Sequence, residues 1–556
     1  MDLFGKKKVS EDLERLNHEA EERDAERRAV EAKLPHINLF STSVDLDSLK
    51  KIPEERARLA EAAVIDSKQN RLAIAIFDAN NPELKKLVEE FNRAGILVSL
   101  FISSLRGLEH TWIRYREIKE APREGALGEV NIKETKSFAG LDLTHIGAEI
   151  KQLEKSSTET TGLLDFILGS AITIGASDIH FEPAKEDALV RFRIDGLLYD
   201  VCRLEKPSYT FVLNRLKLVS GLKINVSDAA QDGRFTTTLK QEDIEVRTSV
   251  IPSEYGETVV MRVLDPKTIS LSLTDLGLRP DDREIIDREL KRPNGTILVT
   301  GPTGSGKTTS LYAFLKAVKS SELKIITIED PIEYHLDGIE QTQVDPGSGY
   351  TFSTGLRSIL RQDPDIILVG EIRDLETAEI GMHAALTGHL VFSTLHTNDA
   401  AGAVPRLVDL GAKTSIIGPA INIIIAQRLV RKLCDDCKVE IAPNEAILNK
   451  IKSFINGLPE KTKSLYANQT PKLYESYGCS KCHGGFKGRI GIFEFLKCGD
   501  EMEALIARES TEEAIKKLGR SQGMVEMQGD GVLKAISGLT TLKEVERITG
   551  PVDWLS

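Results

Sequence analysis

The sequence has no long hydrophobic run and no surplus of basic residues. Its longest apolar stretches, such as residues 416–426, fall well short of the ~18–20 residues that a membrane-spanning helix needs. Residues 1–8 lack the apolar core of a signal peptide, so none is expected. The net charge of -12 disfavours a nucleic-acid-binding protein. These absences predict a cytoplasmic protein that touches a membrane only through partners and makes no direct contact with nucleic acid.

Cysteine is also scarce, but its distribution is informative. Four of the six cysteines form two C-x-x-C pairs, which in a reducing cytosol indicates a metal site before a disulfide. Four thiolates complete a tetrahedral zinc site with no open position, so the predicted role is structural, with free thiols or a redox pair as alternatives. Cys202 and Cys498 are isolated and are expected to be packing residues. The predicted zinc ligands are Cys434, Cys437, Cys479 and Cys482.

One stretch carries a specific chemical signature. Residues 301–308 match G-x-x-x-x-G-K-[ST] completely, with a β-prone segment before them and a helical pattern after them. Gly304 and Gly306 let backbone N–H groups turn inward around phosphates, and the helix N-terminus adds partial positive charge. Lys307 is expected to reach the β- and γ-phosphates of ATP, and Thr308 to hold Mg²⁺. The predicted nucleotide-binding residues are Gly301, Pro302, Thr303, Gly304, Ser305, Gly306, Lys307, Thr308 and Thr309.

Two apolar segments after this motif end in acidic residues. Residues 324–333 are a predicted buried strand that ends in three acids, Glu329, Asp330 and Glu333, one of which could polarise the attacking water. A loop held by Asp and Pro is the alternative. Residues 365–371 resemble a Walker B strand, whose acid Glu371 would coordinate Mg²⁺ directly or through water.

A third apolar segment, residues 388–397, is flanked by His389 and His396. A lone histidine is usually structural. However, His396 follows a strand expected to lie beside the strand that precedes the phosphate-binding turn, so we predict that it senses the γ-phosphate.

At 556 residues the chain is too long for one hydrophobic core, and its composition is that of a multidomain globular protein. Composition and pattern predict an α/β protein: a P-loop NTPase core, a mixed α/β N-terminal domain, a small α/β docking domain and a zinc-binding subdomain. No catalytic constellation appears in residues 36–120, which favours docking. A partner-binding helix is an alternative for the charged segment at the start of the chain. The predicted segments are a charged helical or disordered tail (1–35), a docking domain (36–120), a linker (121–160), the mixed domain (161–285), the ATPase core (286–432), the tetracysteine subdomain (433–497) and a helical region (498–556).

The order of these motifs resembles the secretion-ATPase superfamily of type II secretion and type IV pilus assembly. The resemblance covers about residues 163–549 and rests on several stretches. They are 176–183 (ASDIHFEP), 190–196 (VRFRIDG), 231–234 (QDGR), 300–309, 329–333 (EDPIE), 360–365 (LRQDPD), 369–374 (VGEIRD), 387–389 (TGH) and 393–398 (STLHTN). Residues 36–120 resemble the family's first N-terminal domain less specifically.

This resemblance implies a RecA-like core and a hexameric ring, with ATP between the mixed domain and the core. It assigns Glu333 as the water-activating base, Glu371 as the Walker B acid, and both histidines to the family's His box. It also implies that Arg247 and Arg262 are arginine fingers, which agrees with the need for guanidinium groups at the γ-phosphate. A surface ion pair is the alternative for these two. The implied partners are an inner-membrane platform protein and a cytoplasmic or membrane docking protein, with the ring peripheral at the inner face of the membrane.

Three departures from the family pattern refine the prediction. Residues 225–230 lack the usual basic side chains, and the cysteine pairs favour an assembly or secretion motor over a retraction motor. The N-terminal region lacks an Arg-Leu-Gly motif of the kind that binds cyclic di-GMP in some relatives, so that ligand is not predicted. The predicted function is an ATPase that powers assembly of a type IV pilus or a type II secretion pseudopilus. A nucleotide-gated scaffold and a DNA-uptake or conjugation motor are the alternatives.

Overall fold

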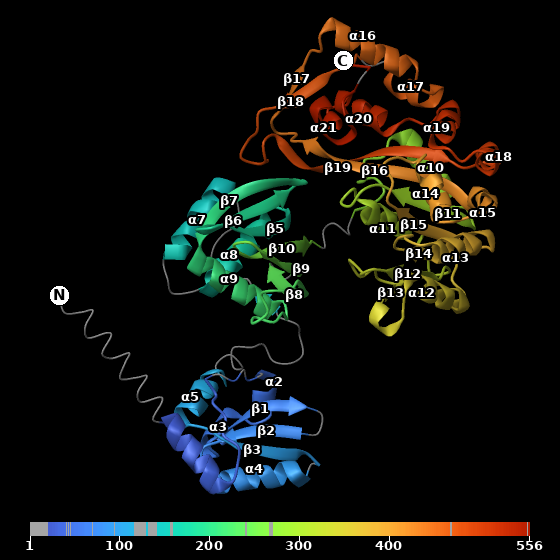
Figure 1. Cartoon of the computed structure of the whole chain (residues 1–556). Coiled ribbons are helices and arrows are strands. Elements are labelled where there is room, and N and C mark those ends of the chain that lie inside the picture. The colour runs from blue at the N-terminus through green and yellow to red at the C-terminus, as the bar shows by residue number, and fades with distance from the viewer. Residues whose placement is uncertain are drawn as a thin grey trace. The chain divides into compact units, whose positions relative to one another are not determined.

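The computed structural model describes residues 21–40, 42, 44, 46–68, 71–93, 95–115, 129–131, 142–155, 160–239, 242–265, 271–467, 470–552 and 554–555. Tertiary contacts divide the chain into two compact units, Met1–Ala126 and Leu127–Ser556 (Figure 1). Residues 1–20 of the predicted tail lie outside the described residues, as do residues 121–128, 132–141 and 156–159 of the predicted linker.

The first unit is a small α/β domain. Its elements are α2 (Leu46–Leu49), α3 (Glu54–Leu59), β1 (Ala62–Lys68), β2 (Arg71–Ile76), α4 (Pro82–Arg93), β3 (Leu97–Ile102) and α5 (Leu105–Ile113). The sheet has the order β1–β2–β3, with β1 antiparallel and β3 parallel to β2. Helix α5 follows β3, and Ser104 caps its start. The hydroxyl of Ser104 accepts a hydrogen bond from the N–H of Gly107.

Residues 21–32 form a further helix of this unit. Ala25 and Ala29 are buried in the same core as β1 and β2. Their spacing of four residues places both on one helix face, and their small side chains allow close packing. The sequence predicts a solvated helix or a disordered tail over residues 1–35. Residues 21–32 instead form a helix that packs against the core of the first unit. Two alanines suffice to form a buried face in this highly charged segment.

The second unit begins with a mixed domain. Its elements are β4 (Glu129–Asn131), α7 (Leu143–Lys155), α8 (Thr160–Thr173), β5 (Ala176–Pro183), β6 (Asp187–Ile194), β7 (Leu197–Glu205), α9 (Lys206–Val219), β8 (Gln231–Leu239), β9 (Glu242–Ser253) and β10 (Gly256–Leu264). The strands form one sheet in the order β4–β8–β9–β10–β5–β6–β7. Helix α7 lies where the sequence predicts a linker. Its Ile146 and Ile150 are buried in the domain core, so this part of the segment is an integral helix.

The core of the second unit is a larger α/β sheet. Its elements are α10 (Pro280–Glu289), β11 (Gly295–Thr300), α11 (Lys307–Val318), β12 (Ile325–Glu329), β13 (Glu340–Gln343), α12 (Phe352–Ile359), β14 (Ile366–Val369), α13 (Leu375–Leu386), β15 (Leu390–Leu395), α14 (Ala403–Asp409), α15 (Thr414–Ala420), β16 (Ile421–Leu433) and β19 (Phe486–Lys497), with short 3-10 helices at Pro346–Ser348 and Leu360–Gln362. The strand order is β13–β12–β14–β15–β11–β16–β19, and every pair is parallel except β16–β19.

Both faces of this sheet are covered, which explains its nearly continuous apolar strands. In β11, Ile297 and Val299 pack with the P-loop helix α11, whereas Leu298 belongs to the opposite core with α12 and α13. All six residues of β11 are buried. Burying each such branched side chain stabilises the fold by roughly 1.5–3 kcal/mol. The strand that leads into the P-loop is therefore firmly held from both sides.

The strands β16 and β19 form a long antiparallel arm. Their pairing runs from Ile423 opposite Lys497 to Leu433 opposite Phe486, and one cysteine pair follows β16 while the other precedes β19. The sequence places residues 433–497 in one subdomain, whereas β19 is the edge strand of the core sheet. The remaining elements are β17 (Lys438–Ile441), α16 (Glu445–Asn456), α17 (Glu460–Tyr466), β18 (Leu473–Ser476), α18 (Asp500–Arg508), α19 (Glu512–Ser521), α20 (Met527–Ile536) and α21 (Leu542–Thr549).

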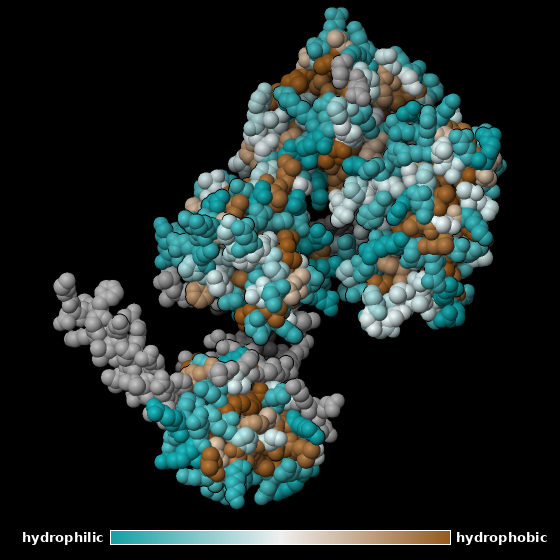
Figure 2. Space-filling model, viewed as in Figure 1, coloured by the Kyte–Doolittle hydropathy of each residue, from teal (hydrophilic) through white to brown (hydrophobic). Residues whose placement is uncertain are grey.

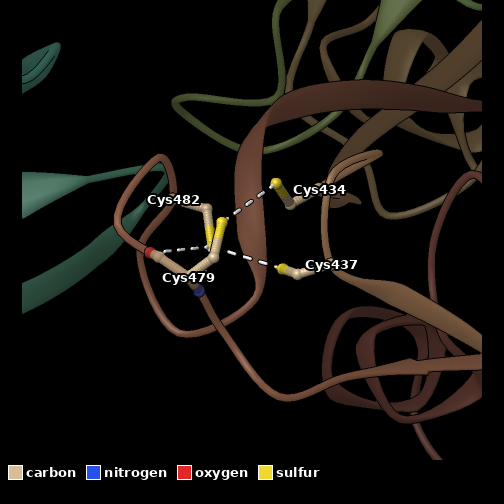
Figure 3. Close-up of side chains that lie close together, drawn as sticks. All are labelled: Cys434, Cys437, Cys479 and Cys482. Atoms are coloured by element: carbon tan, nitrogen blue, oxygen red, sulfur yellow. Dashed lines mark hydrogen bonds between the residues drawn. The ribbon is translucent and has the colours of Figure 1, made fainter.

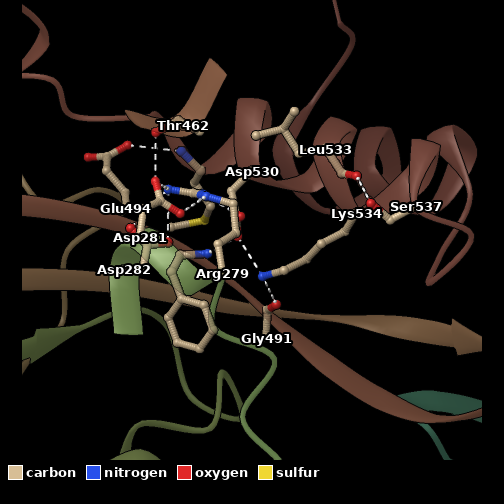
Figure 4. Close-up of polar contacts among 12 residues, drawn as sticks. Arg279, Asp281, Asp282, Thr462, Gly491, Glu494, Asp530, Leu533, Lys534 and Ser537 are labelled. Carbon is tan, nitrogen blue, oxygen red and sulfur yellow. Dashed lines mark hydrogen bonds and ion pairs between the residues drawn. The ribbon is translucent and has the colours of Figure 1, made fainter. Parts of the chain in front are cut away.

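A buried charge network joins the start of α10 to α20 (Figure 4). Arg279 donates to Asp282 at 2.9 Å and to Asp281 at 3.1 Å, and it also pairs with Asp530. Lys534 lies 2.6 Å from the other oxygen of Asp530. The cluster therefore contains three carboxyl groups and two cations. Burial raises the pKa of Asp282 to about 7, and the negative charges of Asp530 and Asp281 act in the same direction, so this carboxyl is the uncompensated one.

The variant Asp282→Asn should change how stability depends on pH. The folded-state pKa of Asp282, about 7, lies above its ordinary value of 3.8, so the folded protein holds this proton more tightly. The stability that this proton provides is fully present below about pH 4, is lost progressively as pH rises to about 7 and is constant above that. We therefore expect the advantage of Asp282→Asn over the wild type in unfolding free energy to be roughly 1–3 kcal/mol larger at about pH 8 than at about pH 5.5. Calorimetric melting at both pH values measures this.

The control is Asp287→Asn on the same helix, where a half-exposed carboxylate pairs with Arg283 at 2.9 Å. This variant should keep the wild-type pH dependence. Identical pH profiles for the wild type and Asp282→Asn would contradict the assignment of Asp282 as the excess buried charge.

The visible surface is largely hydrophilic, and its apolar residues gather in small groups (Figure 2). Among the residues that the structure describes, none of the helices combines the length and the apolar character that a membrane span requires.

Candidate active site

The P-loop lies between the carboxyl end of β11 and the first turn of α11. Gly304 and Gly306 have φ values of 78° and 88°, which side-chain-bearing residues rarely adopt. Lys307 is buried, and its Nζ donates to the carbonyl oxygens of Gly301 at 2.8 Å and Pro302 at 3.1 Å. Burial lowers the pKa of Lys307, while the nearby carboxylates of two glutamates raise it. The loop thus holds one buried ammonium group beside two acids.

These two acids are Glu333 and Glu371. Thr308, the second residue of α11, makes a side-chain hydrogen bond with Glu333. Burial raises the pKa of Glu333, and the guanidinium groups of Arg247 and Arg262 oppose that rise. A partly buried carboxylate with a raised pKa at the mouth of a phosphate-binding loop is suited to accept a proton.

Glu371 follows β14, the strand between β12 and β15. Its carboxylate is mostly buried, forms an ion pair with Arg373 and lies 3.4 Å from Nε2 of His396. Burial lowers the pKa of His396, and the positive charge of Lys307 lowers it further, which favours the neutral imidazole. The structure therefore brings the predicted Walker B acid, the P-loop lysine and His396 together at the carboxyl edge of the sheet.

His389 lies elsewhere. It precedes β15, and its carbonyl oxygen accepts a hydrogen bond from the N–H of Gly295, the first residue of β11. Its Nδ1 lies 3.0 Å from the carbonyl oxygen of Ala384 at the end of α13. Because β11 and β15 are parallel, His389 is at the amino edge of the sheet and the P-loop is at the opposite edge. The two histidines of this segment do not share a site.

The three acids at the carboxyl end of β12 and just after it, Glu329, Asp330 and Glu333, also have different environments. Glu329 is buried and accepts hydrogen bonds from three side chains. Asp330 lies 3.5 Å from Arg373. Of these three, Glu333 is the one whose carboxyl group meets Thr308. The course of the loop thus separates three candidates that the motif by itself does not distinguish.

Two arginines reach this region from the mixed domain. Arg247 on β9 and Arg262 on β10 face each other in register. Arg247 donates from Nη2 to the carbonyl oxygen of Ile332 at 2.7 Å, next to Glu333. Arg262 donates from Nε to Asp178 at 3.1 Å and has a half-exposed side chain. Both guanidinium groups act on the pKa of Glu333, so positive charge from a separate sheet faces the P-loop mouth.

Two further pairs support the P-loop and have no signal in the sequence. The N–H of Thr397 donates to the hydroxyl of Thr300 at 3.0 Å, which ties the segment after His396 to the end of β11. The hydroxyl of Ser310 donates to Gln427 at 2.8 Å, which ties α11 to β16. Each pair joins residues about 100 positions apart, and such pairs form only once the strands are assembled.

The four paired cysteines converge at the end of the β16–β19 arm (Figure 3). Their sulfur atoms all lie within 4.8 Å of one another. Cys434–Cys479, Cys437–Cys482 and Cys479–Cys482 have Sγ–Sγ distances of 3.9, 3.7 and 3.6 Å. Four Zn–S bonds of about 2.3 Å in a tetrahedron place the sulfurs about 3.8 Å apart, so the cluster fits zinc.

Comparison with known proteins identifies the family. Residues 153–547 match the family described as "Type II/IV secretion system protein". The chain belongs to this family. A type II secretion system ATPase E from Vibrio cholerae is 46% identical over 388 residues, covering 70% of this chain and 75% of the relative. The type IV pilus assembly ATPase PilB of Myxococcus xanthus is 36% identical over 530 residues, covering 93% of this chain and 89% of the relative.

A solved structure shows the same fold. The chain is similar to the ATPase DotB of Legionella pneumophila with a TM-score of 0.50 and 23% identity, covering 69% of this chain and 94% of that one. The predicted fold class is confirmed: this secretion ATPase family member has a P-loop NTPase (RecA-like) core, a mixed α/β N-terminal domain, a small N-terminal α/β domain and a tetracysteine subdomain.

The P-loop of this family member fits a nucleotide and its metal ion. A Cβ atom added at Gly304 would meet no neighbour within 4 Å, so the space beside this glycine is open, whereas a Cβ atom added at Gly306 would lie 2.8 Å from Nε2 of Gln427. The hydroxyl of Ser305 is buried and has no hydrogen-bond partner among the described residues. Thr308 and Glu371 offer a hydroxyl and a carboxylate oxygen, the donor types that Mg²⁺ prefers. The predicted roles of these side chains remain predictions.

The cysteine cluster of this family member should bind about one zinc ion per chain. Elemental analysis of the purified protein should find stoichiometric zinc in the wild type, and Cys479→Ser should lose most of it, because three thiolates no longer close the site. Cys202→Ser, which alters a cysteine outside the cluster, should keep the metal. Absence of metal together with four reactive thiols would contradict the zinc assignment.

Proposed function

We propose that this protein is a hexameric ATPase whose hydrolysis-driven domain motion powers assembly of a type IV pilus or a type II secretion pseudopilus. One observation carries the proposal. Glu333 and Glu371 lie near enough to Lys307 to raise its pKa, and Arg247 from the mixed domain contacts the loop that presents Glu333. Such a site is complete only when the two domains are together, so turnover and domain movement are coupled.

The chemistry follows from these positions. Water attacks the γ-phosphorus of ATP, the bond between that phosphorus and the bridging oxygen of ADP breaks, and Glu333 accepts the proton of the water. Lys307, Arg247 and Arg262 offset the negative charge that spreads over the phosphoryl oxygens. Thr308 and Glu371 would hold Mg²⁺, which supplies charge neutralisation at the phosphates. His396, whose Nε2 lies 3.4 Å from Glu371, would respond to the γ-phosphate.

The relatives support the cellular role. They include a type II secretion system ATPase and a pilus assembly ATPase, both similar over at least 70% of this chain. We propose that the partners are further copies of this chain, an inner-membrane platform protein and a docking protein that engages the first unit. The protein would act at the cytoplasmic face of the inner membrane through these partners.

The test of the ATPase proposal is the variant Lys307→Ala. Loss of the buried ammonium group should abolish ATP turnover, with a decrease in kcat/KM of about 1,000-fold or more, because binding and charge stabilisation are both lost. Phosphate release by the purified protein measures this. Lys316→Ala, which alters an exposed lysine on the same helix, should keep wild-type turnover.

Two outcomes would contradict the proposal. Near-normal turnover by Lys307→Ala would refute the assigned site. Tight ATP binding by a wild-type protein that forms rings but releases no phosphate would favour a nucleotide-gated scaffold. Sedimentation of the nucleotide-bound protein tests the hexamer, and loss of surface filaments or of secretion after gene deletion tests the cellular role.

A further inference from the structure

A second carboxylate network lies directly behind the P-loop. Glu329, the last residue of β12, is 4% exposed. Its Oε2 accepts a hydrogen bond from the hydroxyl of Tyr312 on α11. Its Oε1 accepts from Thr327 at 2.6 Å and from Nε2 of Gln341 on β13 at 3.1 Å. Each of the three donors belongs to a different element: the P-loop helix α11, the strand β12 and the edge strand β13.

Gln341 carries this network on to the loop that holds Glu333. Its Nε2 also donates to the carbonyl oxygen of Tyr334 at 3.0 Å, and its Oε1 accepts from the N–H of Leu336 at 2.7 Å. Gln341 thus holds the backbone directly after Glu333. On the other side of Glu333, the N–H of Ile332 donates to Gln343, and the carbonyl oxygen of Ile332 accepts from Arg247.

Glu329 is itself unable to serve as a base in water. It is buried, and its two oxygens already accept three hydrogen bonds. A buried carboxylate is retained in a fold when several donors satisfy it, and such a satisfied network holds its members rigidly. Burial and the charge of Glu329 raise the pKa of Tyr312, so this hydroxyl stays protonated and remains a donor.

We propose that Glu329 is a positioning residue, and that Tyr312, Glu329 and Gln341 together hold the loop of residues 330–336 so that Glu333 meets Thr308. This inference rests on the proposed ATPase function. The network links the P-loop helix to the base through three side chains, so a shift of α11 is transmitted to the carboxylate that accepts the proton. Glu329 acts through the loop and touches no reacting atom.

The first test is the variant Glu329→Gln. The amide nitrogen of the new glutamine cannot accept a hydrogen bond, so either the hydroxyl of Tyr312 or the amide of Gln341 loses its acceptor. We expect kcat for ATP hydrolysis to fall by about 10- to 100-fold, because displacement of a catalytic group by about 1 Å has an effect of this size. The Kd for ATP should stay within about twofold, because the P-loop residues are untouched. Tyr312→Phe is a milder variant that keeps the ring and should lower kcat by about 3- to 10-fold.

The second test is a double-variant cycle on the hydrogen bond from Tyr312 to Glu329. In Tyr312→Phe/Glu329→Gln both ends of this bond are changed. We expect the decrease in kcat to be at least about threefold smaller than the product of the two single decreases, because the second change removes an interaction that the first has already lost. Tyr350→Phe is the control: it removes a hydroxyl that lies 3.2 Å from Thr342 on the same strand, and it should leave kcat unchanged.

Hydrogen exchange provides a readout that does not require activity. Amide exchange of residues 330–336 should be faster in Glu329→Gln and in Tyr312→Phe than in the wild type, while exchange of the strand β11 stays the same. Unchanged exchange in this loop, or single decreases in kcat that simply multiply in Tyr312→Phe/Glu329→Gln, would overturn the proposal. A loss of ATP binding together with a lower melting temperature would also overturn the proposal, because a purely structural residue gives that pattern. If the wild type releases no phosphate, the ATPase assignment fails while the exchange result still decides the positioning role.

Discussion

The variant Glu333→Gln should lower kcat for ATP hydrolysis by about 100- to 10,000-fold. The amide has nearly the shape of the carboxylate but cannot accept the proton of the attacking water. Its oxygen can still accept the hydrogen bond from Thr308, so the P-loop should keep its geometry. The Kd for ATP should therefore stay within about twofold, since binding depends on Lys307 and the loop backbone. Single-turnover phosphate release, with ATP binding measured separately, checks both quantities.

The matched control is Glu340→Gln on β13, where an exposed carboxylate lies 4.0 Å from Lys324. This variant should keep the wild-type kcat. Two results would contradict the assignment of Glu333: turnover by Glu333→Gln within a few-fold of the wild type, or a loss of ATP binding as large as the loss of turnover. The first would move the base to another residue, and the second would make Glu333 a ligand-binding residue.

The variant Arg247→Ala should lower kcat by about 1,000-fold or more, which is the range seen when an arginine finger is removed. The guanidinium group approaches the P-loop from β9, donates to the carbonyl oxygen of Ile332 and opposes the raised pKa of Glu333. Its removal takes away both the positive charge at the phosphoryl group and a contact that holds the loop. ATP binding to the core should change little, because Arg247 belongs to the mixed domain.

Arg247→Lys should recover little of this loss, because a lysine has no planar fork to contact the backbone and the phosphoryl group at once. Arg262→Ala should give a smaller decrease, since Arg262 is half-exposed and is paired with Asp178. Arg203→Ala is the control: its partly exposed side chain pairs with Asp187 on the far strands of the same sheet, and turnover should be unchanged. If Arg247→Ala keeps the wild-type kcat, Arg247 is not an arginine finger and forms only a surface ion pair.

Much of the core could be predicted because its signals are local. The phosphate-binding turn, its strand and its helix are contiguous, so residues 296–318 show the motif and its context together. The strands before Glu371 and His396 are short apolar runs with polar ends, and parallel strands deliver such ends to one edge of a sheet. Their convergence at the P-loop follows from topology once the strand order is known.

Other features could not be read from local patterns. Helix 21–32 has two alanines in an otherwise charged segment, and only the packed surface of the first unit shows that they are buried. The edge strand β19 is about 60 residues after β16 in the sequence, and the hydrogen bonds between the two strands make it part of the core sheet. His389 and His396 look equivalent in the sequence, but the two ends of one strand lie on opposite edges of the sheet.

The sequence by itself determined the P-loop motif with its strand and helix, and it predicted the acids that we propose for hydrolysis. The motif could be read because its residues are contiguous, and a glycine-rich turn between a strand and a helix has one geometry. The local pattern did not distinguish the acids at the end of β12, and although the family resemblance pointed to Glu333, only the tertiary structure gave each acid its surroundings. Three hydrogen bonds hold the buried side chain of Glu329 in the protein interior. The loop after β12 instead places Glu333 near Thr308 and Arg247. That selection depends on partners from the P-loop helix, from two strands of the core sheet and from a strand of a second sheet, which no local pattern encodes.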